Sequence, residues 1–247
     1  MTLALAAVIG LAVGFLGGLL GKGGSAIATP MLHAIGVPAI VAVAAPLPAT
    51  IPSTIVAGYA YSREKLVDWR VFRWSVWFGV PSTVFGALLT RWISGGSLVK
   101  VTDVVLIALG IRLVLGALEA KPEVPLVVHS PGWQLAVVAV AVGVVSGLLA
   151  NSGGFLLAPL FMAVLRLPVK SALASSLAVA SVLALPGTIV HAALGHMNWT
   201  IVLVFGSTSV PLSLLGARTA LRTDPQHLER IYGGALIVLG AVFLIIS

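Results

Sequence analysis

The chain has 247 residues, a formal net charge of +7 and charged side chains at only 9% of its positions, with a mean hydropathy of +1.13. Soluble domains average about 25% charged residues, so this composition excludes a soluble globular protein. The chain has no cysteine, which excludes disulfides, thiolate metal sites and relay of sulfur through a reactive thiol.

Eight apolar runs follow one another along the chain. They cover residues 3–20, 40–61, 71–92, 98–118, 133–150, 169–194, 201–221 and 231–246. A helix that spans a bilayer needs roughly 17–25 such residues, whereas strands of a membrane barrel would alternate over about ten. We therefore expect an all-α, polytopic membrane protein. The first run lacks a basic leader and recurs inside the chain, so we interpret it as mature structure and not as a signal peptide.

A glycine-rich break follows the first run and precedes a short helix expected over about 25–35. The break consists of Gly21, Lys22, Gly23, Gly24 and Ser25. Irregular backbone at membrane depth is buried in protein or lines a wet cavity, and the start of the next helix offers free N–H groups to an anion. Lys22 adds a full positive charge, which inside a membrane indicates function. The alternative is that Lys22 snorkels to the interface while the glycines pack helices.

The helix expected over 40–61 contains Pro46, Pro48 and Pro52, which disrupt an α-helix. Hydroxyl side chains accompany these prolines, and more of them occupy the matching helix of the second half. Ser53 and Ser176 represent the two sets as candidate contacts along a polar path. The alternative is that each hydroxyl bonds a carbonyl of its own helix.

The second half of the chain repeats the first. Gly14 matches Gly143 at an offset of 129 residues, and from Pro38, which matches Pro168, the offset is 130. We expect one transmembrane domain made of two repeats, 1–119 and 132–247, joined by a polar, proline-containing linker at 120–131. The second break lacks the lysine but keeps hydrogen-bond donors and glycines. It consists of Asn151, Ser152, Gly153 and Gly154.

The distribution of Lys and Arg predicts that the repeats are inverted. If each glycine-broken hairpin enters and leaves on one face, ten basic residues collect on one side and two on the other; the parallel alternative gives eight and five. The ten are Arg63, Lys65, Arg70, Arg73, Lys121, Arg166, Lys170, Arg218, Arg222 and Arg230. Cytoplasmic loops carry the basic excess, so both termini are expected outside. Inverted repeats with broken helices are a recurring build of secondary transporters.

Signals for catalysis and for other ligands are absent from the sequence. It contains no HExxH, Walker A or GxSxG motif, and no carboxylate lies deep in an apolar run. We expect no enzyme activity, no cofactor and no metal. The basic residues flank apolar runs instead of forming one patch, so we expect no nucleic-acid partner. The expected partners are a small anionic substrate and the lipid bilayer. The oligomeric state stays open, with a homodimer as one option.

Three features together resemble the sulfite exporter TauE/SafE family of permeases. They are the stretch GFLGGLLGKGGS with the later PML and GVP, its degenerate repeat GLLANSGG, and the boundaries VDW (67–69) and MNW (197–199). The resemblance covers essentially the whole chain. It implies a multi-pass inner-membrane transporter of a small sulfur-containing anion, such as sulfite or an organosulfonate like sulfoacetate. Two departures stand out: Lys22 replaces a residue that is often small, and the second break has fewer glycines.

Two other classes remain open at this stage. A passive anion channel would need a continuous polar pore with many weak sites. A membrane scaffold or assembly factor would hold no tight small ligand, although broken hairpins cost stability if they hold nothing.

Overall fold

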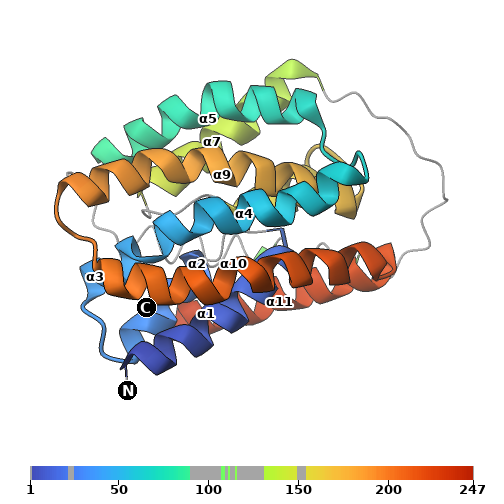
Figure 1. Ribbon diagram of the computed structural model, residues 1–247. Helices are drawn as coiled ribbons and strands as arrows, with labels where there is room; N and C mark the ends of the chain where they lie inside the picture. The colour runs from blue at the N-terminus through green and yellow to red at the C-terminus, as the bar shows by residue number, and fades with distance from the viewer. Residues whose placement is uncertain are drawn as a thin grey trace.

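The computed structural model describes residues 2–21, 25–89, 107–108, 111, 115, 131–148 and 154–246. Within these ranges the regular secondary structure is entirely α-helical, which confirms the predicted fold class (Figure 1). The helices are α1 (Thr2–Leu19), α2 (Ser25–Ala34), α3 (Ala39–Ala44), α4 (Pro46–Arg63), α5 (Trp69–Leu89), α7 (Gly132–Leu148), α8 (Gly154–Ala163), α9 (Val169–Ala193), α10 (Trp199–Arg222) and α11 (Pro225–Ile246). The expected run at 98–118 and the expected linker at 120–131 lie outside the described residues, apart from positions 107, 108, 111, 115 and 131.

Four of the described segments are long and apolar enough to cross a membrane. They are Thr2–Leu19, Ile40–Arg63, Val169–Ala193 and Trp199–Arg222. Large apolar side chains also point away from the bundle: Trp77 is 78% exposed and Leu203 is 70% exposed. Such a surface is stable against lipid and not against water. The protein is therefore a multi-pass membrane protein.

The helix expected over 40–61 is in fact two helices. α3 ends at Ala44, and α4 begins at Pro46 after the single intervening residue Ala45. Pro46 and Pro48 occupy the first turn of α4, where a missing N–H costs little because that group has no partner inside the helix. Pro52 lies inside α4. The prediction that these prolines disrupt the helix is therefore correct only at the break between α3 and α4, just before Pro46.

The backbone repeats its turns at the predicted offset. The amide of Leu66 donates to the carbonyl of Tyr61 just after α4, and the amide of His196 donates to that of His191 just after α9. Within these turns Lys65 and Gly195 both have positive φ, 55° and 70°. Gly36 and Arg166, which follow α2 and α8, form a second such pair at 88° and 53°. Left-handed residues commonly end helices in this way, so the two halves use the same helix stops.

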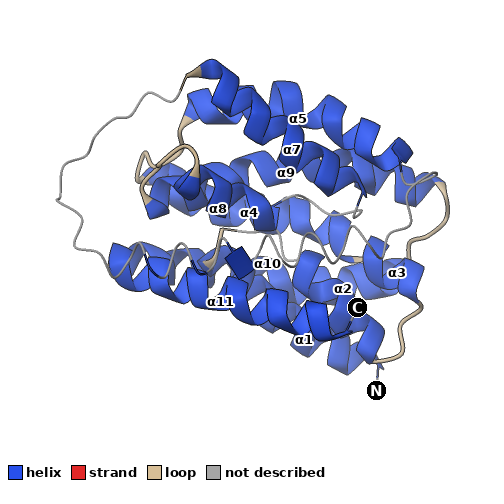
Figure 2. Ribbon diagram, turned by 180° about the vertical axis from the view of Figure 1, so that it is seen from behind, coloured by secondary structure: helices blue, strands red, loops and turns tan. Residues whose placement is uncertain are grey.

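Each half packs its first helix against the other half. α1 lies along α10, and α7, the repeat counterpart of α1, lies along α5, the counterpart of α10 (Figures 1 and 2). α4 and α9, which are counterparts of each other, pack together between these pairs. In Figure 1 both termini lie at one end; α1, α4 and α10 run away from that end, and α5, α7 and α9 run back towards it. These counterpart helices run in opposite directions along the bundle. The inverted orientation of the repeats across a membrane stays a prediction.

Helix ends that carry basic residues meet at the other end of the bundle. The C-termini of α4 and α10 and the N-termini of α5, α9 and α11 all lie there (Figure 1). Lys170, in the first turn of α9, donates to the carbonyl of Leu221 in the last turn of α10 at 2.7 Å. The helix ends that carry most of the ten basic residues therefore meet at one end of the bundle.

Candidate functional site

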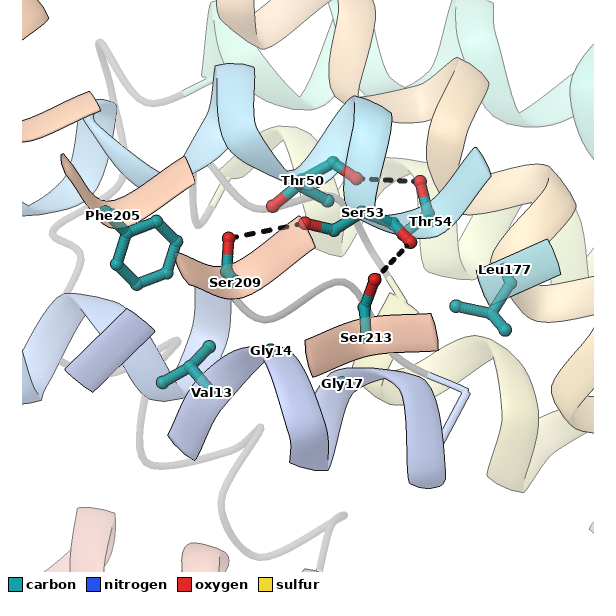
Figure 3. Close-up of a pocket in the computed structure, with 10 residues that line it drawn as sticks. All are labelled: Val13, Gly14, Gly17, Thr50, Ser53, Thr54, Leu177, Phe205, Ser209 and Ser213. Atoms are coloured by element: carbon teal, nitrogen blue, oxygen red, sulfur yellow. Dashed lines mark hydrogen bonds between the residues drawn. The ribbon is translucent and has the colours of Figure 1, made fainter. Parts of the chain in front are cut away.

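A small cavity with five hydroxyl residues in its lining lies between α1, α4 and α10, and one side chain of α9 also lines it (Figure 3). The described residues that line it are Val13, Gly14, Gly17, Thr50, Ser53, Thr54, Leu177, Phe205, Ser209 and Ser213. Its volume is about 10 Å³, roughly what one water molecule requires. None of these ten residues is charged. The cavity as it stands is too small for a sulfur oxyanion.

Three serines form the polar centre of the cavity. The hydroxyls of Ser53 on α4 and Ser209 on α10 lie 3.3 Å apart, and either can donate to the other. The hydroxyl of Ser213, one turn further along α10, donates to the carbonyl of Ser53 at 2.9 Å. All three side chains are at least nine-tenths buried. The Ser209 hydroxyl can also donate to the carbonyl of Gly206 at 3.5 Å, so Ser53 can donate to Ser209 while Ser209 donates within its own helix.

The two threonines of the cavity bond to their own helix. Thr50 donates to the carbonyl of Pro46 at 2.9 Å, and Thr54 donates to that of Thr50 at 2.8 Å. This is the alternative that the sequence left open for such hydroxyls. Their oxygens can still accept, and their hydrogens already have partners. The cavity therefore holds five hydroxyl groups and no charged side chain, and its hydroxyls are bonded to acceptors within the protein.

Glycines on α1 let that helix approach the serines closely. A Cβ atom built on Gly14 would overlap the carbonyl oxygen of Ser209, and one built on Gly18 would overlap that of Ser213. Any larger residue would separate α1 from α10. Small residues bring membrane helices into this kind of backbone contact, and here the contact forms one side of the cavity.

Ser53 is the predicted site residue that the structure places in the cavity. Ser176, the other predicted hydroxyl contact, lies elsewhere: it donates to the carbonyl of Gly21 at 2.5 Å and to that of Leu173 at 2.9 Å. Gly21 has φ of 62°, and a Cβ there would come within 2.7 Å of Leu173. Ser176 and Gly21 thus fasten the end of α1 to α9, so their evident role is to position helices.

The remaining predicted site residues fall in the two glycine breaks. Lys22, Gly23, Gly24, Asn151, Ser152 and Gly153 lie outside the described residues. α2 begins at Ser25 and α8 at Gly154. Each break is therefore followed directly by the start of a helix, as the anion-site argument requires. The direct involvement of these eight residues in binding stays a prediction.

Sequence analysis missed Ser209 and Ser213. The available signal was the polar run Ser207–Ser209 inside an apolar helix, with Ser213 four residues after Ser209 on the same face. The repeat counterparts of Ser209 and Ser213 are Gly79 and Thr83. The first half therefore has no matching serine pair that would mark these two positions.

Comparison with known proteins identifies the chain's relatives. A family model described as "Sulfite exporter TauE/SafE" matches residues 6–243. The chain belongs to the TauE/SafE family. A "Probable membrane transporter protein" of Xylella fastidiosa strain Temecula1 is 29% identical over 240 residues, which cover 95% of this chain and 91% of that protein. The "Probable membrane transporter protein YunE" of Bacillus subtilis is 24% identical and covers 97% of this chain and 96% of its own length. No solved structure matches this TauE/SafE chain.

Membership confirms the resemblance that the glycine-broken repeats suggested. TauE/SafE proteins form a family of membrane transporters, in agreement with the four apolar helices able to span a bilayer. In this TauE/SafE protein the cavity lies between three of the long helices, and its serines are buried. Such a position is where transporters hold their substrates.

Proposed function

We propose that this protein is a secondary transporter of a small sulfur-containing anion, sulfite or an organosulfonate such as sulfoacetate, in the cell's inner membrane. The observation that carries the proposal is the buried serine cavity in a chain of the TauE/SafE family. Three convergent serines suit the tetrahedral or pyramidal oxygens of such an anion, because each hydroxyl can turn from its present acceptor and donate to one oxygen when the anion enters.

The charge that balances the anion is assigned to Lys22. Gly17 of α1 lines the cavity, and Lys22 follows Gly17 by five residues in the sequence. Neutral hydroxyl groups select an anion by the positions of its oxygens. The ammonium group of a lysine attracts the anion's charge, and this attraction is stronger at low dielectric. Asn151 and Ser152 in the second break are assigned hydrogen-bond donation to the same anion, since the start of α8 directly follows them.

The size of the cavity supports alternating access over a permanent pore. A volume of about 10 Å³ is too small for such an anion at this cavity, so binding there requires helices to separate. Two inverted halves would give two related openings on opposite faces. The passive channel is the second candidate, and it predicts ohmic conductance where the transporter predicts saturable exchange.

The test is ligand-induced stabilisation followed by transport. The purified protein is melted with sulfite, sulfate, thiosulfate, sulfoacetate, taurine, phosphate, acetate and chloride in turn. A ligand that binds the native state raises its stability by RT ln(1 + [L]/Kd), about 2.7 kcal/mol at 100-fold excess over Kd. We expect a selective shift with sulfite or a sulfonate, and saturable uptake of the same anion into proteoliposomes.

The variant Lys22→Ala tests the assignment of the charge. We expect it to fold, to lose the anion-dependent shift and to lose uptake. A folded Lys22→Ala protein with unchanged affinity would remove Lys22 from the site. The absence of a shift and of uptake for every anion, in folded wild-type protein, would overturn the proposed function.

A further inference from the structure

Backbone contacts lock α1 to α10. A Cβ atom on Gly10 would lie 2.8 Å from the carbonyl oxygen of Phe205, and a Cβ on Gly216 would overlap the carbonyl oxygen of Phe15. Gly14 and Gly18 make the same kind of contact further along the seam. Backbone cannot move aside as a flexible side chain can, so these two helices cannot slide without losing the contact.

The seam between α5 and α7 is built in the same way. A Cβ on Gly143 would lie 2.6 Å from the carbonyl oxygen of Gly79, and a Cβ on Gly86 would overlap that of Val144. Gly86 and Val144 are the repeat counterparts of Gly216 and Phe15. The same contact therefore occurs twice, and each time it joins a helix of one half to a helix of the other.

A third helix is attached to each locked pair. α4 is tied to α10, because Ser213 donates to the carbonyl of Ser53 and a Cβ on Gly206 would touch Ala49 at 3.4 Å. α9 packs against α5, and its Ser175 accepts from the amide of Asp68, directly before α5, at 2.9 Å. This gives two three-helix groups: a first body of α1, α4 and α10, and a second body of α5, α7 and α9.

α4 and α9 also pack closely, and here the two bodies meet; at the two glycines of this interface the nearest atoms of the opposite helix belong to leucine side chains. A Cβ on Gly58 of α4 would lie 3.7 Å from the Cβ of Leu177, and one on Gly187 of α9 would lie 3.4 Å from the Cδ1 of Leu47. These are ordinary van der Waals distances. Leu47 and Leu177 are repeat counterparts, so the interface places each leucine near a glycine of the opposite helix. Leucines can repack where backbone cannot.

The cavity belongs almost wholly to the first body. Of its described lining, Leu177 of α9 is the one residue from the second body. In Figure 3 Leu177 lies at the end of the cavity beyond Ser213 and Thr54. The second body therefore contributes Leu177 to a cavity whose other described lining residues all belong to the first body.

We propose that the protein moves as these two bodies, each drawn from both halves of the sequence, and that Leu177 is the side chain that closes the anion cavity. The inference rests on the proposed function. It replaces the simpler expectation that one repeat moves against the other, because the glycines between α1 and α10 meet backbone, whereas those between α4 and α9 meet leucine side chains that can repack. Two hydrogen bonds, from Ser176 to Gly21 and from Lys170 to Leu221, also join the two bodies. Separation of the bodies at that end of the bundle would break these bonds.

Distances between pairs of spin labels test which helices move together. Because the chain has no cysteine of its own, labels attach only at the introduced cysteines. Exposed positions for cysteine substitution are Leu11 on α1, Leu203 on α10 and Trp77 on α5. Labels are attached through thioethers, because sulfite cleaves disulfides. Leu11→Cys with Leu203→Cys joins different halves within the first body, and Leu11→Cys with Trp77→Cys joins the two bodies within one half. Distances are measured in double electron–electron resonance with and without saturating sulfite, on doubly labelled proteins that still transport sulfite.

We expect the Leu11–Leu203 distance to stay constant and the Leu11–Trp77 distance to change on adding sulfite. The reverse result would mean that the repeats move as units and would overturn the inference. Unchanged distances for both pairs in protein that transports sulfite would overturn it as well. The absence of transport for every anion would instead contradict the proposed function, so the two failures are distinguishable.

The variant Leu177→Ala tests the closing side chain, with Leu47→Ala as its matched control. Both leucines are about 1% exposed and face a glycine across the same interface, but Leu47 does not appear in the cavity lining. We expect similar losses of melting temperature in the two variants, and a several-fold increase in sulfite leak through proteoliposomes only for Leu177→Ala. An equal sulfite leak in both variants would show that Leu177 is not the side chain that closes the cavity.

Discussion

The hydroxyl of Ser213 on α10 donates to the backbone carbonyl of Ser53 on α4 at 2.9 Å, and both residues are buried in the polar cavity. The bond spans 160 residues of sequence and both halves of the chain. It holds the Ser53 hydroxyl opposite Ser209. The cavity's polar centre is therefore a product of the packing of α4 on α10.

Replacing Ser209 by Ala removes the hydroxyl that faces Ser53. Because a net hydrogen bond contributes about 1 kcal/mol, we expect the protein to stay folded and its affinity for sulfite to fall by about tenfold, which corresponds to ~1.4 kcal/mol. Titration of the sulfite-dependent melting shift measures this. Ser207→Ala is the control, because Ser207 is exposed and bonds only locally to Val204. An equal loss in both variants would place the effect outside the cavity.

Replacing Gly14 by Ala inserts a methyl group into the backbone of α10. We expect a loss of about 1–3 kcal/mol or more in stability, since overpacking against backbone has no cheap relaxation. The measurement is the melting temperature and the monodisperse yield in detergent. Gly234→Ala on α11 is the control: a Cβ there meets nothing within 4 Å, so it should stabilise the helix by up to about 1 kcal/mol. A tolerated Gly14→Ala would contradict the locked α1–α10 seam.

Lys65 and Gly195 occupy repeat-equivalent left-handed positions, and exchanging their residue types should move stability in opposite directions. Lys65→Gly relieves a side chain held at φ of 55° and should stabilise by up to about 1 kcal/mol, whereas Gly195→Ala should cost about that amount. A Cβ on Gly195 meets nothing within 4 Å, so crowding does not enter. Thermal unfolding in detergent checks both signs, and a stabilising Gly195→Ala would contradict the turn geometry.

Asn198 caps α10: its side-chain oxygen accepts from the amide of Ile201 at 3.2 Å. Asn198→Ala should cost about 1 kcal/mol, and Asn198→Asp should retain most of the stability, as at repeat-equivalent Asp68, which accepts from Val71 at 3.0 Å. The comparison is of melting temperatures. Thr200→Ala, an exposed change in the same first turn, is expected to have little effect.

Sequence alone determined the features that depend on local composition. The long apolar runs fix a helical membrane protein, because lipid leaves the backbone no other partners than its own. The end of α1 at Leu19, just before the glycine-rich break, depends on residues near it in sequence. The duplication follows from matched glycines and prolines at a constant offset.

Tertiary structure decided which helices meet and where the cavity lies. In a membrane the lipid-facing and buried faces of a helix are both apolar, so hydrophobic periodicity does not show which face packs inward. The pairing of α1 with α10 instead depends on whether Gly14 can reach the carbonyl of Ser209, which no pattern within one helix reveals. Ser53, Ser209 and Leu177 come from three helices and converge only once that packing is complete, because close packing of small residues drives helix association in lipid.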